Sequence, residues 1–401
     1  MLITAMCCAE ILGMLGVFAF PALLPRFMEA WNLSNAQAGW INGIYFAGYT
    51  VAVPLLTSLT DRMDARRIYL VLSGVGALAN LGFCFLASGF WTALAFRAMS
   101  GLGLAGTYVP GLKALIDRVD PSRQPRAISF YTACFGLGMS LSFLAAGEID
   151  RRFGWQAAFG AAAAGSGFAL LVAAGCLNPI RSGIRTRTAA AVFDFRAVWQ
   201  NRSARAYILT YMCHMWEMFA ARSWLVAFLS FSISLQGADG IWVPPTTVMA
   251  LAGIGGMIAS IAGGELALRF GRRRTVAVIM WISAILALAI GFTAALPYPV
   301  VAGVCILYTL FFQGDSAAIH AGVILSAEAD RRGATMALQS LAGFAAASIG
   351  SVAAGFVLEL SGEGRSLFSW ALTFASMGAV GALGPILASR CGPRPPSVER
   401  H

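Results

Sequence analysis

The chain has 401 residues, of which 58% are hydrophobic and only 11% charged, and its mean hydropathy is +0.74. Soluble domains carry about 25% charged residues. A soluble fold of this length could not bury so much apolar surface, so the composition predicts an all-α membrane protein. The net charge of +10 comes almost wholly from arginine and lies between apolar stretches, which indicates membrane topology rather than nucleic-acid binding.

Twelve stretches of the chain are apolar over the length needed to cross a bilayer, which is about 20 residues. They form two groups of six on either side of a polar segment, and they predict twelve transmembrane helices in two six-helix bundles. Met1 leads into the first stretch without a basic region or a small-residue cleavage site, so we expect this stretch to stay as a helix. The predicted spans are 2–25, 37–59, 68–88, 90–116, 127–148, 155–177, 205–232, 245–267, 275–295, 298–325, 335–360 and 367–389.

Lysine and arginine are distributed unevenly over the loops. Of the 28 such residues, 22 lie around the loops that follow even-numbered spans or in the C-terminal tail, and four lie in loops that follow odd-numbered spans. Loops rich in these residues stay in the cytoplasm. The asymmetry therefore predicts a multi-pass protein of the inner (plasma) membrane with both termini in the cytoplasm.

The longest polar segment separates the two groups of spans. Its proline and glycine break the helix, and Phe195, Val198 and Trp199 predict one apolar face of a short helix lying on the membrane. The predicted divisions are an N-terminal bundle (1–177), a cytoplasmic central loop (178–204), a C-terminal bundle (205–390) and a cytoplasmic tail (391–401).

A short basic turn occurs twice, after the second and after the eighth span. The arginines of the first copy recur in the second with a constant shift of 207 positions. A constant shift over half the chain predicts two copies of one structural unit. The first copy contains Thr57, Asp61, Arg62, Asp64, Arg66 and Arg67, and the second contains Gly264, Arg269, Gly271, Arg273 and Arg274.

These features together resemble the major facilitator superfamily, whose signature turn reads G-x-x-x-D-[RK]-x-G-x-[RK]-[RK]. The first copy departs from it at Thr57 and Asp64, where the family has glycine, and the second at Leu268, where the family has aspartate. Asp tolerates the left-handed conformation of a tight turn. The resemblance implies two pseudo-symmetric halves around a midplane site, and a latch between them built on Asp61 and Arg62. The alternative is that these arginines only set the orientation.

A second match lies in the fourth span, where Arg97-Ala-Met-Ser-Gly101-Leu-Gly103 resembles the family's R-x-x-x-G-x-G. The resemblance implies that Arg97 takes part in proton coupling or anion binding. The alternative is an arginine paired with an acid inside the membrane.

Ionisable side chains inside the spans are candidate functional residues, because each costs about 2.5–3.5 kcal/mol to insert. Glu10 in the first span and Glu217 in the seventh differ by the same 207 positions. We therefore expect the two acids to face one central cavity as proton sites or substrate ligands. The alternative is two structural acids, each hydrogen-bonded within its own half.

The seventh span holds further candidates. His214 lies three residues before Glu217, hence on the same helix face, and can tune or relay its proton; the alternative is a histidine bonded to a backbone carbonyl. If Arg222 faces the cavity, it can bind a carboxylate or similar oxyanion through two parallel hydrogen bonds. The other candidates for the substrate and proton site are Tyr108, Trp216 and Asp315.

We therefore predict a proton-coupled secondary transporter that works by alternating access. The two intramembrane arginines favour uptake of a small organic or inorganic anion. A proton-driven exporter of a drug-like or metabolite solute is the alternative, although the fifth span lacks the proline-containing run typical of such exporters; a membrane solute sensor is a third reading. No phosphate-binding loop, zinc spacing or catalytic constellation predicts an enzyme, a cofactor or a metal. The expected partners are a small solute, protons and the lipid bilayer, with no nucleic acid, and the expected state is a monomer.

Overall fold

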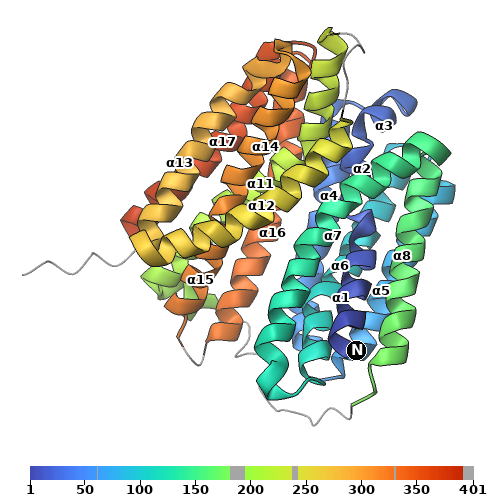
Figure 1. Cartoon of the computed structure of the whole chain (residues 1–401), viewed down its shortest axis with the longest axis vertical. Coiled ribbons are helices and arrows are strands. Elements are labelled where there is room, and N and C mark those ends of the chain that lie inside the picture. The colour runs from blue at the N-terminus through green and yellow to red at the C-terminus, as the bar shows by residue number, and fades with distance from the viewer. Residues whose placement is uncertain (61, 181–194, 237–242, 329–330, 392–401) are drawn as a thin grey trace, which may run out of the picture.

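The computed structural model describes residues 1–60, 62–180, 195–236, 243–328 and 331–391. Every regular element in these ranges is a helix, which confirms the all-α prediction. Figure 1 shows two helical bundles side by side, one coloured blue to green and the other yellow to red.

The first bundle begins with an interrupted helix. After α1 (Leu2–Gly13) the chain passes through a 3-10 turn, η1 (Met14–Gly16), into two short helices, α2 (Ala19–Ala22) and α3 (Leu24–Ala30). The predicted first span is therefore not one continuous helix. The bundle continues with α4 (Asn35–Thr60), α5 (Ala65–Leu86), α6 (Phe90–Ile116), η2 (Pro121–Arg123), α7 (Gln124–Phe153) and α8 (Trp155–Cys176).

The second bundle follows a short helix, α10 (Phe195–Gln200), on which Val198 is buried against α11 and α16. A second discontinuity lies at Asp315, between α14 and α15. The elements are α11 (Arg202–Gln236), α12 (Pro245–Phe270), α13 (Arg272–Ile290), η3 (Gly291–Ala295), α14 (Tyr298–Gly314), α15 (Ser316–Ser326), α16 (Arg332–Leu360) and α17 (Leu367–Cys391).

Within the described ranges, nine helical segments are long and apolar enough to cross a membrane. Helices α4 and α6 also have sufficient length, with 26 and 27 residues. Large apolar side chains cover outward faces, including Phe85 at 74% and Ile258 at 66% exposure, as suits a surface in contact with lipid. The chain is thus a multi-pass membrane protein, and the count of twelve spans stays a prediction.

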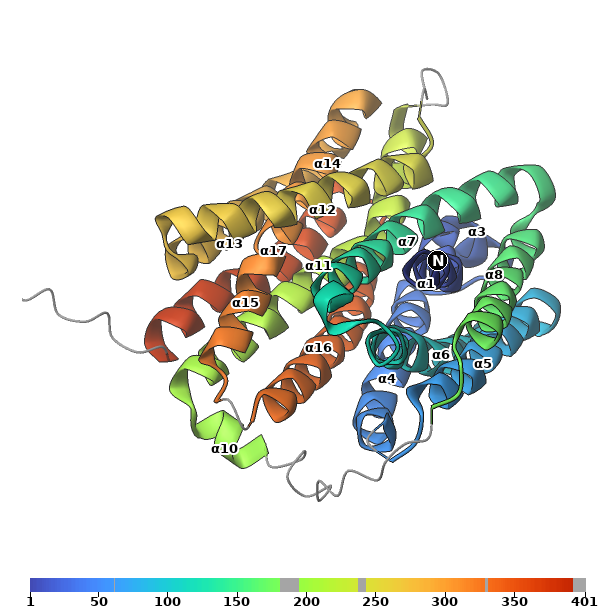
Figure 2. The ribbon, with the colours of Figure 1, turned by 60° about the horizontal axis from the view of Figure 1, so that its bottom comes forward.

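The two bundles meet along two helix pairs, α4 with α16 and α7 with α12 (Figure 2). In the first pair the backbones lie close together because small residues face each other. A Cβ on Gly39 would lie 3.1 Å from the carbonyl oxygen of Ser351 and 3.2 Å from the Cα of Gly355. Small residues of this kind allow close helix contact in lipid, where burial of apolar surface does not drive association.

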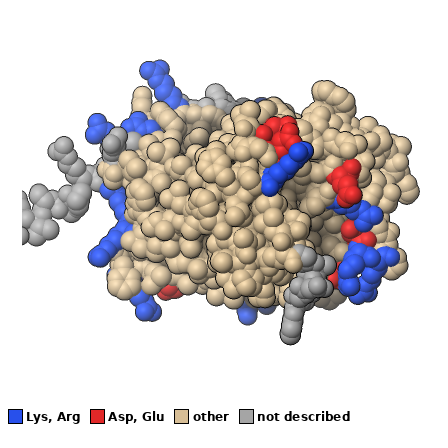
Figure 3. All heavy atoms as spheres, turned by 90° about the horizontal axis from the view of Figure 1, so that it is seen from above, with Lys and Arg blue, Asp and Glu red and all other residues tan. Residues whose placement is uncertain are grey.

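Aromatic rings from both bundles form a cluster beside these contacts. The ring of Phe219 (α11) lies 6.2 Å from Phe18, 4.5 Å from Phe46 (α4) and 5.9 Å from Phe344 (α16). We call Phe18, Phe46, Phe219 and Phe344 the aromatic cluster. The cluster joins the bundles near the middle of α4, α11 and α16. Figure 3 views the end of the molecule opposite the N-terminus, and the surface there is mostly uncharged.

Candidate functional site

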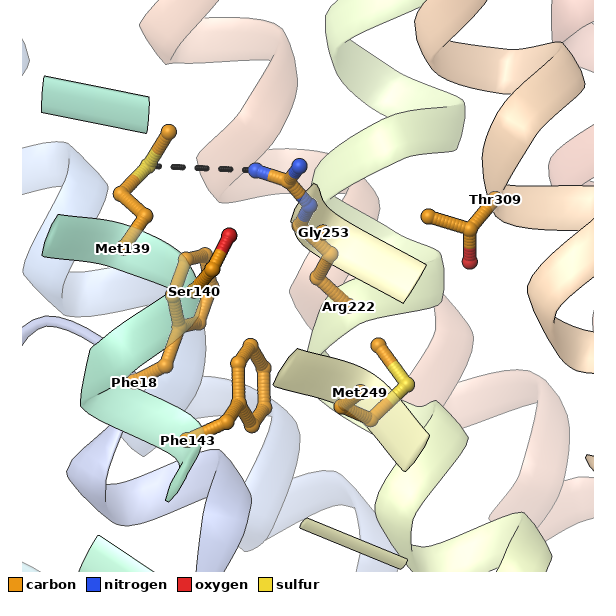
Figure 4. A pocket seen from close by; sticks show the side chains of 8 residues that line it. All are labelled: Phe18, Met139, Ser140, Phe143, Arg222, Met249, Gly253 and Thr309. Atoms are coloured by element: carbon orange, nitrogen blue, oxygen red, sulfur yellow. Dashed lines mark hydrogen bonds between the residues drawn. The ribbon is translucent and has the colours of Figure 1, made fainter. Parts of the chain in front are cut away.

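A small pocket lies where the two bundles meet, next to the aromatic cluster (Figure 4). Phe18 and α7 contribute to it from the first bundle, and α11, α12 and α14 from the second. Its side chains pack so closely that no room is left for a water molecule between them. The residues that line it are Phe18, Met139, Ser140, Phe143, Arg222, Met249, Gly253 and Thr309.

Arg222 is the charged residue of this pocket, and its side chain is almost fully buried, with 4% exposure. Its Nη2 donates a 2.7 Å hydrogen bond to Gln313 Oε1, whereas its Nη1 faces the sulfur of Met139 at 3.8 Å, a weak acceptor. Among the described residues, no carboxylate lies within ion-pair distance of Arg222. The pocket therefore holds a buried cation without a counter-charge, an arrangement that favours an anionic ligand.

The discontinuity between α14 and α15 connects Arg222 with a second polar pair. Gln313 lies two residues before Asp315, and Asp315 Oδ1 lies 2.7 Å from His214 Nδ1. Both side chains of this pair are buried, with exposures of 1% and 2%. His214 thus contacts an acid from another helix, and neither Glu217 nor a backbone carbonyl is its close partner.

Glu217 lies inside the second bundle. Its Oε1 accepts hydrogen bonds from Ser283 (2.7 Å) and Tyr308 (3.1 Å), and its Oε2 faces Gly381 of α17. The expectation that Glu217 faces a cavity shared with Glu10 is not met, because α13 and α14 supply the hydrogen-bond donors for its carboxylate. The contacts match the alternative of an acid bonded within its own half.

Glu10 is also buried within its own bundle. Its Oε2 accepts a 2.6 Å hydrogen bond from the hydroxyl of Tyr131 on α7, whereas its buried Oε1 has no partner in the described structure. Tyr108 packs against the same tyrosine, with ring centroids 6.4 Å apart, and lies 4.1 Å from Phe135. Tyr108 is therefore a neighbour of the Glu10 site and does not line the Arg222 pocket.

Arg97 stabilises the interrupted first helix. Its Nη1 and Nη2 each donate a 2.9 Å hydrogen bond to a backbone carbonyl, those of Gly16 and Val17 respectively, and its guanidinium lies 4.1 Å from the Tyr45 ring centroid. These carbonyls lie where the helix is interrupted. The alternative of a pairing with an acid is not found, because backbone oxygens take that place.

Trp216 does not reach the pocket. Its indole packs against Gly350 of α16, where a Cβ would lie 3.1 Å from the ring.

Asp61, the central acid of the first basic turn, lies outside the described residues, and so does the side chain of Thr57. The described part of the turn is organised by Asp64, which caps α5 by accepting a 3.0 Å bond from the backbone N–H of Arg66. Its φ is −58°, so the left-handed conformation considered for this position is not adopted. Instead its carboxylate accepts two bonds from Arg118, of 2.8 and 2.7 Å, and one of 2.9 Å from the N–H of Ile180.

The partners of Asp64 determine its titration. Burial raises the pKa of this carboxyl, but the hydrogen bonds from Arg118, Ile180 and Arg66 outweigh burial and hold the pKa below its usual range. A lowered pKa in the folded state stabilises the fold above the unfolded-state value of about 3.9, and this contribution disappears as the pH falls through the folded-state pKa.

Asp64→Asn is expected to lower the thermal unfolding midpoint at pH 7, because Arg118 loses its buried counter-charge. Hydrogen bonds to charged groups contribute about 1.5–3 kcal/mol. The midpoints of the wild type and the variant, measured in detergent from pH 7 downward, should converge below pH 4. A constant difference over that range would contradict the assigned ion pair.

The other described residues of the basic turns differ in burial and in the contacts that they make. Arg66 donates a 3.0 Å bond to the carbonyl of Ala174 on α8, within the first bundle, and Arg62 and Arg67 are exposed. In the second turn Gly271 has a φ of +89°, which explains the glycine at this position. Gly264 packs against Ala317 of α15, Arg269 and Arg274 are exposed, and Arg273 is half-buried.

Comparison with known proteins identifies the chain. The profile described as Major Facilitator Superfamily matches residues 6–314 and 240–401, which together cover nearly the whole sequence. The chain belongs to the Major Facilitator Superfamily. As a member of this family it is a transporter and not an enzyme.

Relatives within the Major Facilitator Superfamily agree with this assignment. The uncharacterized MFS-type transporter YceJ of Bacillus subtilis (strain 168) is 25% identical over 347 residues, covering 85% of each chain. The niacin transporter NiaP of Acinetobacter baylyi is 27% identical over 144 residues, covering 36% of this chain and 32% of the relative. A crystal structure of a bacterial homolog of human spinster, in an inward-facing and unoccupied conformation, matches 99% of this chain and 98% of its own with a TM-score of 0.82 and 14% identity.

Sequence analysis did not identify several residues of the site. Gln313 is a polar residue within a predicted span, a signal that was available. Arg118, Tyr131 and Met139 carried no such signal, because their roles depend on partners more than 50 residues away.

Proposed function

We propose that this protein is a proton-coupled secondary transporter that takes up a small anion, and that Arg222 is its anion-binding residue. The observation that carries the proposal is the unneutralised guanidinium of Arg222, buried at the junction of the two bundles. A site at the junction of the halves is where alternating access requires the solute to bind. The bidentate geometry of a guanidinium suits a carboxylate or similar oxyanion.

Anion binding is coupled to proton binding through the discontinuity between α14 and α15. An anion that binds Arg222 competes with Gln313 for the same guanidinium, and Gln313 is two residues from Asp315, the partner of His214. Displacement of Gln313 by the anion would shift the end of α14 and change the His214–Asp315 contact. Glu217, one turn from His214 on α11, is the acid that we propose to carry the proton.

Alternating access is supported by the position of the contacts between bundles. They extend from Gly39 near the start of α4 to just past its middle, where the Tyr49 ring lies 3.9 Å from that of Phe344. On α7 they extend from Gly136, which faces Met257 near the middle, to Gly147. Both regions lie toward the end opposite the N-terminus. With both termini in the cytoplasm of an inner-membrane monomer, as the sequence predicts, the bundles are closed on the outer side, as in the inward-facing structure of the spinster homolog.

The names of the relatives mention several different solutes. Besides niacin they include sphingolipids for a spinster homolog of Arabidopsis thaliana, nucleosides for NupG, and organic anions for human MFSD10, whose structure matches with a TM-score of 0.68 and 17% identity. These names do not identify the solute of this protein. The charge at Arg222 is the basis for proposing an anion. Export of a drug-like or metabolite solute remains the second candidate, but it has no comparable support, since neither Glu10 nor Glu217 lines the pocket, where an acid would have to bind a cationic solute.

Glu217→Gln is expected to abolish the pH dependence of uptake, because the amide cannot take up the proton and keeps hydrogen bonding to Ser283 and Tyr308. Initial uptake rates in proteoliposomes between pH 5.5 and 8 would show a flat profile. Glu10→Gln is the matched control, an equally buried acid with a tyrosine partner, and should keep the wild-type profile. An unchanged profile in Glu217→Gln would remove Glu217 from coupling.

A further inference from the structure

The lining of the Arg222 pocket is apolar except at a few points. Phe18 and Phe143 form one wall and the thioethers of Met139 and Met249 lie beside them, with Arg222 pointing toward Met139 (Figure 4). A hydrophilic ion such as phosphate would lose its hydration here without enough donors to replace it. The lining therefore suits an anion whose charge is attached to an apolar body.

The number of donors in the pocket limits the charge of the ligand. Arg222 is the one cation among the lining residues. The hydroxyls of Ser140 and Thr309 donate to carbonyls of their own helices, those of Gly136 and Cys305, so their protons are already used. One guanidinium can neutralise a single carboxylate, and a second negative charge would remain unpaired in a buried site.

The shape of the phenylalanine wall indicates that the apolar part of the ligand is planar. The rings of Phe18 and Phe143 are stacked at a centroid distance of 4.7 Å and an interplanar angle of 14°, so the wall has a flat edge. The Arg222 guanidinium lies 5.7 Å from the Phe18 ring centroid and 6.0 Å from that of Phe219. A planar ring can pack against these phenylalanines and contact the methionine sulfurs while its carboxylate reaches the guanidinium.

We propose that the solute recognised by Arg222 is a planar aromatic monocarboxylate, with the ring held among Phe18, Phe143, Met139 and Met249 and the carboxylate on the guanidinium. This inference rests on the proposed anion uptake and narrows it to one chemical class. The carboxylate takes the place of the Met139 sulfur at Nη1 and of Gln313 Oε1 at Nη2, which lie 3.8 and 2.7 Å from these nitrogens.

Entry of the ring requires side chains to move, because the pocket leaves no space for even a water molecule. Methionine has three rotatable bonds and fills irregular gaps, so Met139 and Met249 can change rotamer at low cost. The aromatic walls can stay in place. The pocket is thus closed by its two most adaptable residues.

The test is thermal unfolding of the full-length protein in detergent with matched pairs of ligands. Benzoate is compared with benzamide (no charge), cyclohexanecarboxylate (no aromatic ring), phthalate (two charges) and inorganic phosphate. Benzoate should raise the unfolding midpoint, with a half-saturating concentration about tenfold lower than that of cyclohexanecarboxylate, phthalate or phosphate. Benzamide should give no shift.

Two variants test the contribution of the aromatic contact separately from that of the charge. Phe143→Leu should weaken benzoate about fivefold and leave cyclohexanecarboxylate within about twofold of wild type, because one aromatic contact is lost. Phe356→Leu, at a position on α16 that is 43% exposed, is the matched control and should bind benzoate as the wild type does. Both variants keep an apolar side chain and remove no hydrogen bond, and their unfolding midpoints without ligand show that the fold is retained before binding is compared.

The outcomes distinguish this inference from the function on which it rests. If cyclohexanecarboxylate or phosphate binds as tightly as benzoate and the binding depends on Arg222, the aromatic class is wrong while anion uptake stands. If benzamide binds as well as benzoate, the role of the charge is overturned. If no anion shifts the midpoint, the proposed anion uptake itself fails.

Discussion

Replacing Arg222 by lysine is expected to raise the KM for the transported anion by at least about tenfold, equivalent to about 1.4 kcal/mol of lost binding. Lysine keeps the charge but loses the planar pair of donors that binds a carboxylate bidentately. Arg222→Met should abolish saturable uptake, because the loss of a buried charged hydrogen-bond partner costs about 2–5 kcal/mol or more.

Initial uptake rates in proteoliposomes measure this effect. Arg152→Lys is the matched control, since Arg152 is 65% exposed at the end of α7 and contacts Glu148 at 3.6 Å; its KM should equal that of the wild type. A wild-type KM in Arg222→Lys would place Arg222 outside the binding site.

The largest effect on stability is expected at Arg97. Arg97→Met leaves the carbonyls of Gly16 and Val17 buried without donors at the interruption of the first helix, at a cost of about 2–5 kcal/mol. Thermal unfolding in detergent should show a lower midpoint together with a lower yield of folded protein. Arg97→Lys should recover part of the loss, because an ammonium can still donate to one or both carbonyls.

The same variant decides between the two roles considered for Arg97. If Arg97→Met unfolds at the wild-type midpoint but loses the pH dependence of uptake, Arg97 acts in coupling and the structural assignment fails. If the midpoint falls and the remaining folded protein shows the wild-type pH profile, the structural role stands.

The sequence was sufficient to predict the helical membrane class and the family, because apolar spans and the basic turns are local patterns. It also singled out Arg222 and Glu217, since a charge within a span is costly wherever it lies. The direction of each side chain could not be predicted. A span buried on all sides, such as that of α11, has no polar face to indicate where Glu217 points, and its donors Ser283 and Tyr308 lie 66 and 91 positions away.

The errors have the same origin. Asp64 was expected to matter for a left-handed turn conformation, but it caps α5 with a φ of −58° and its main partner, Arg118, lies 54 positions along the chain. The interruption of the first span is stabilised by Arg97 and by Ser142, whose hydroxyl donates to the Leu15 carbonyl and accepts from the Phe18 N–H. Such partners are determined by packing between helices, which periodicity along one helix does not report.

The most direct test of the central claim is uptake of labelled benzoate into proteoliposomes under an imposed pH gradient, with wild-type protein and Arg222→Met side by side. The proposed mechanism predicts uptake into wild-type vesicles above that of protein-free vesicles under the same gradient. This excess should increase when the outside is more acidic, disappear with a protonophore, and be absent in Arg222→Met. Benzoic acid crosses bilayers unaided, so protein-free vesicles set the baseline. Wild-type uptake equal to that baseline for benzoate and for every other anion tried, or uptake above the baseline that persists in Arg222→Met, would contradict it.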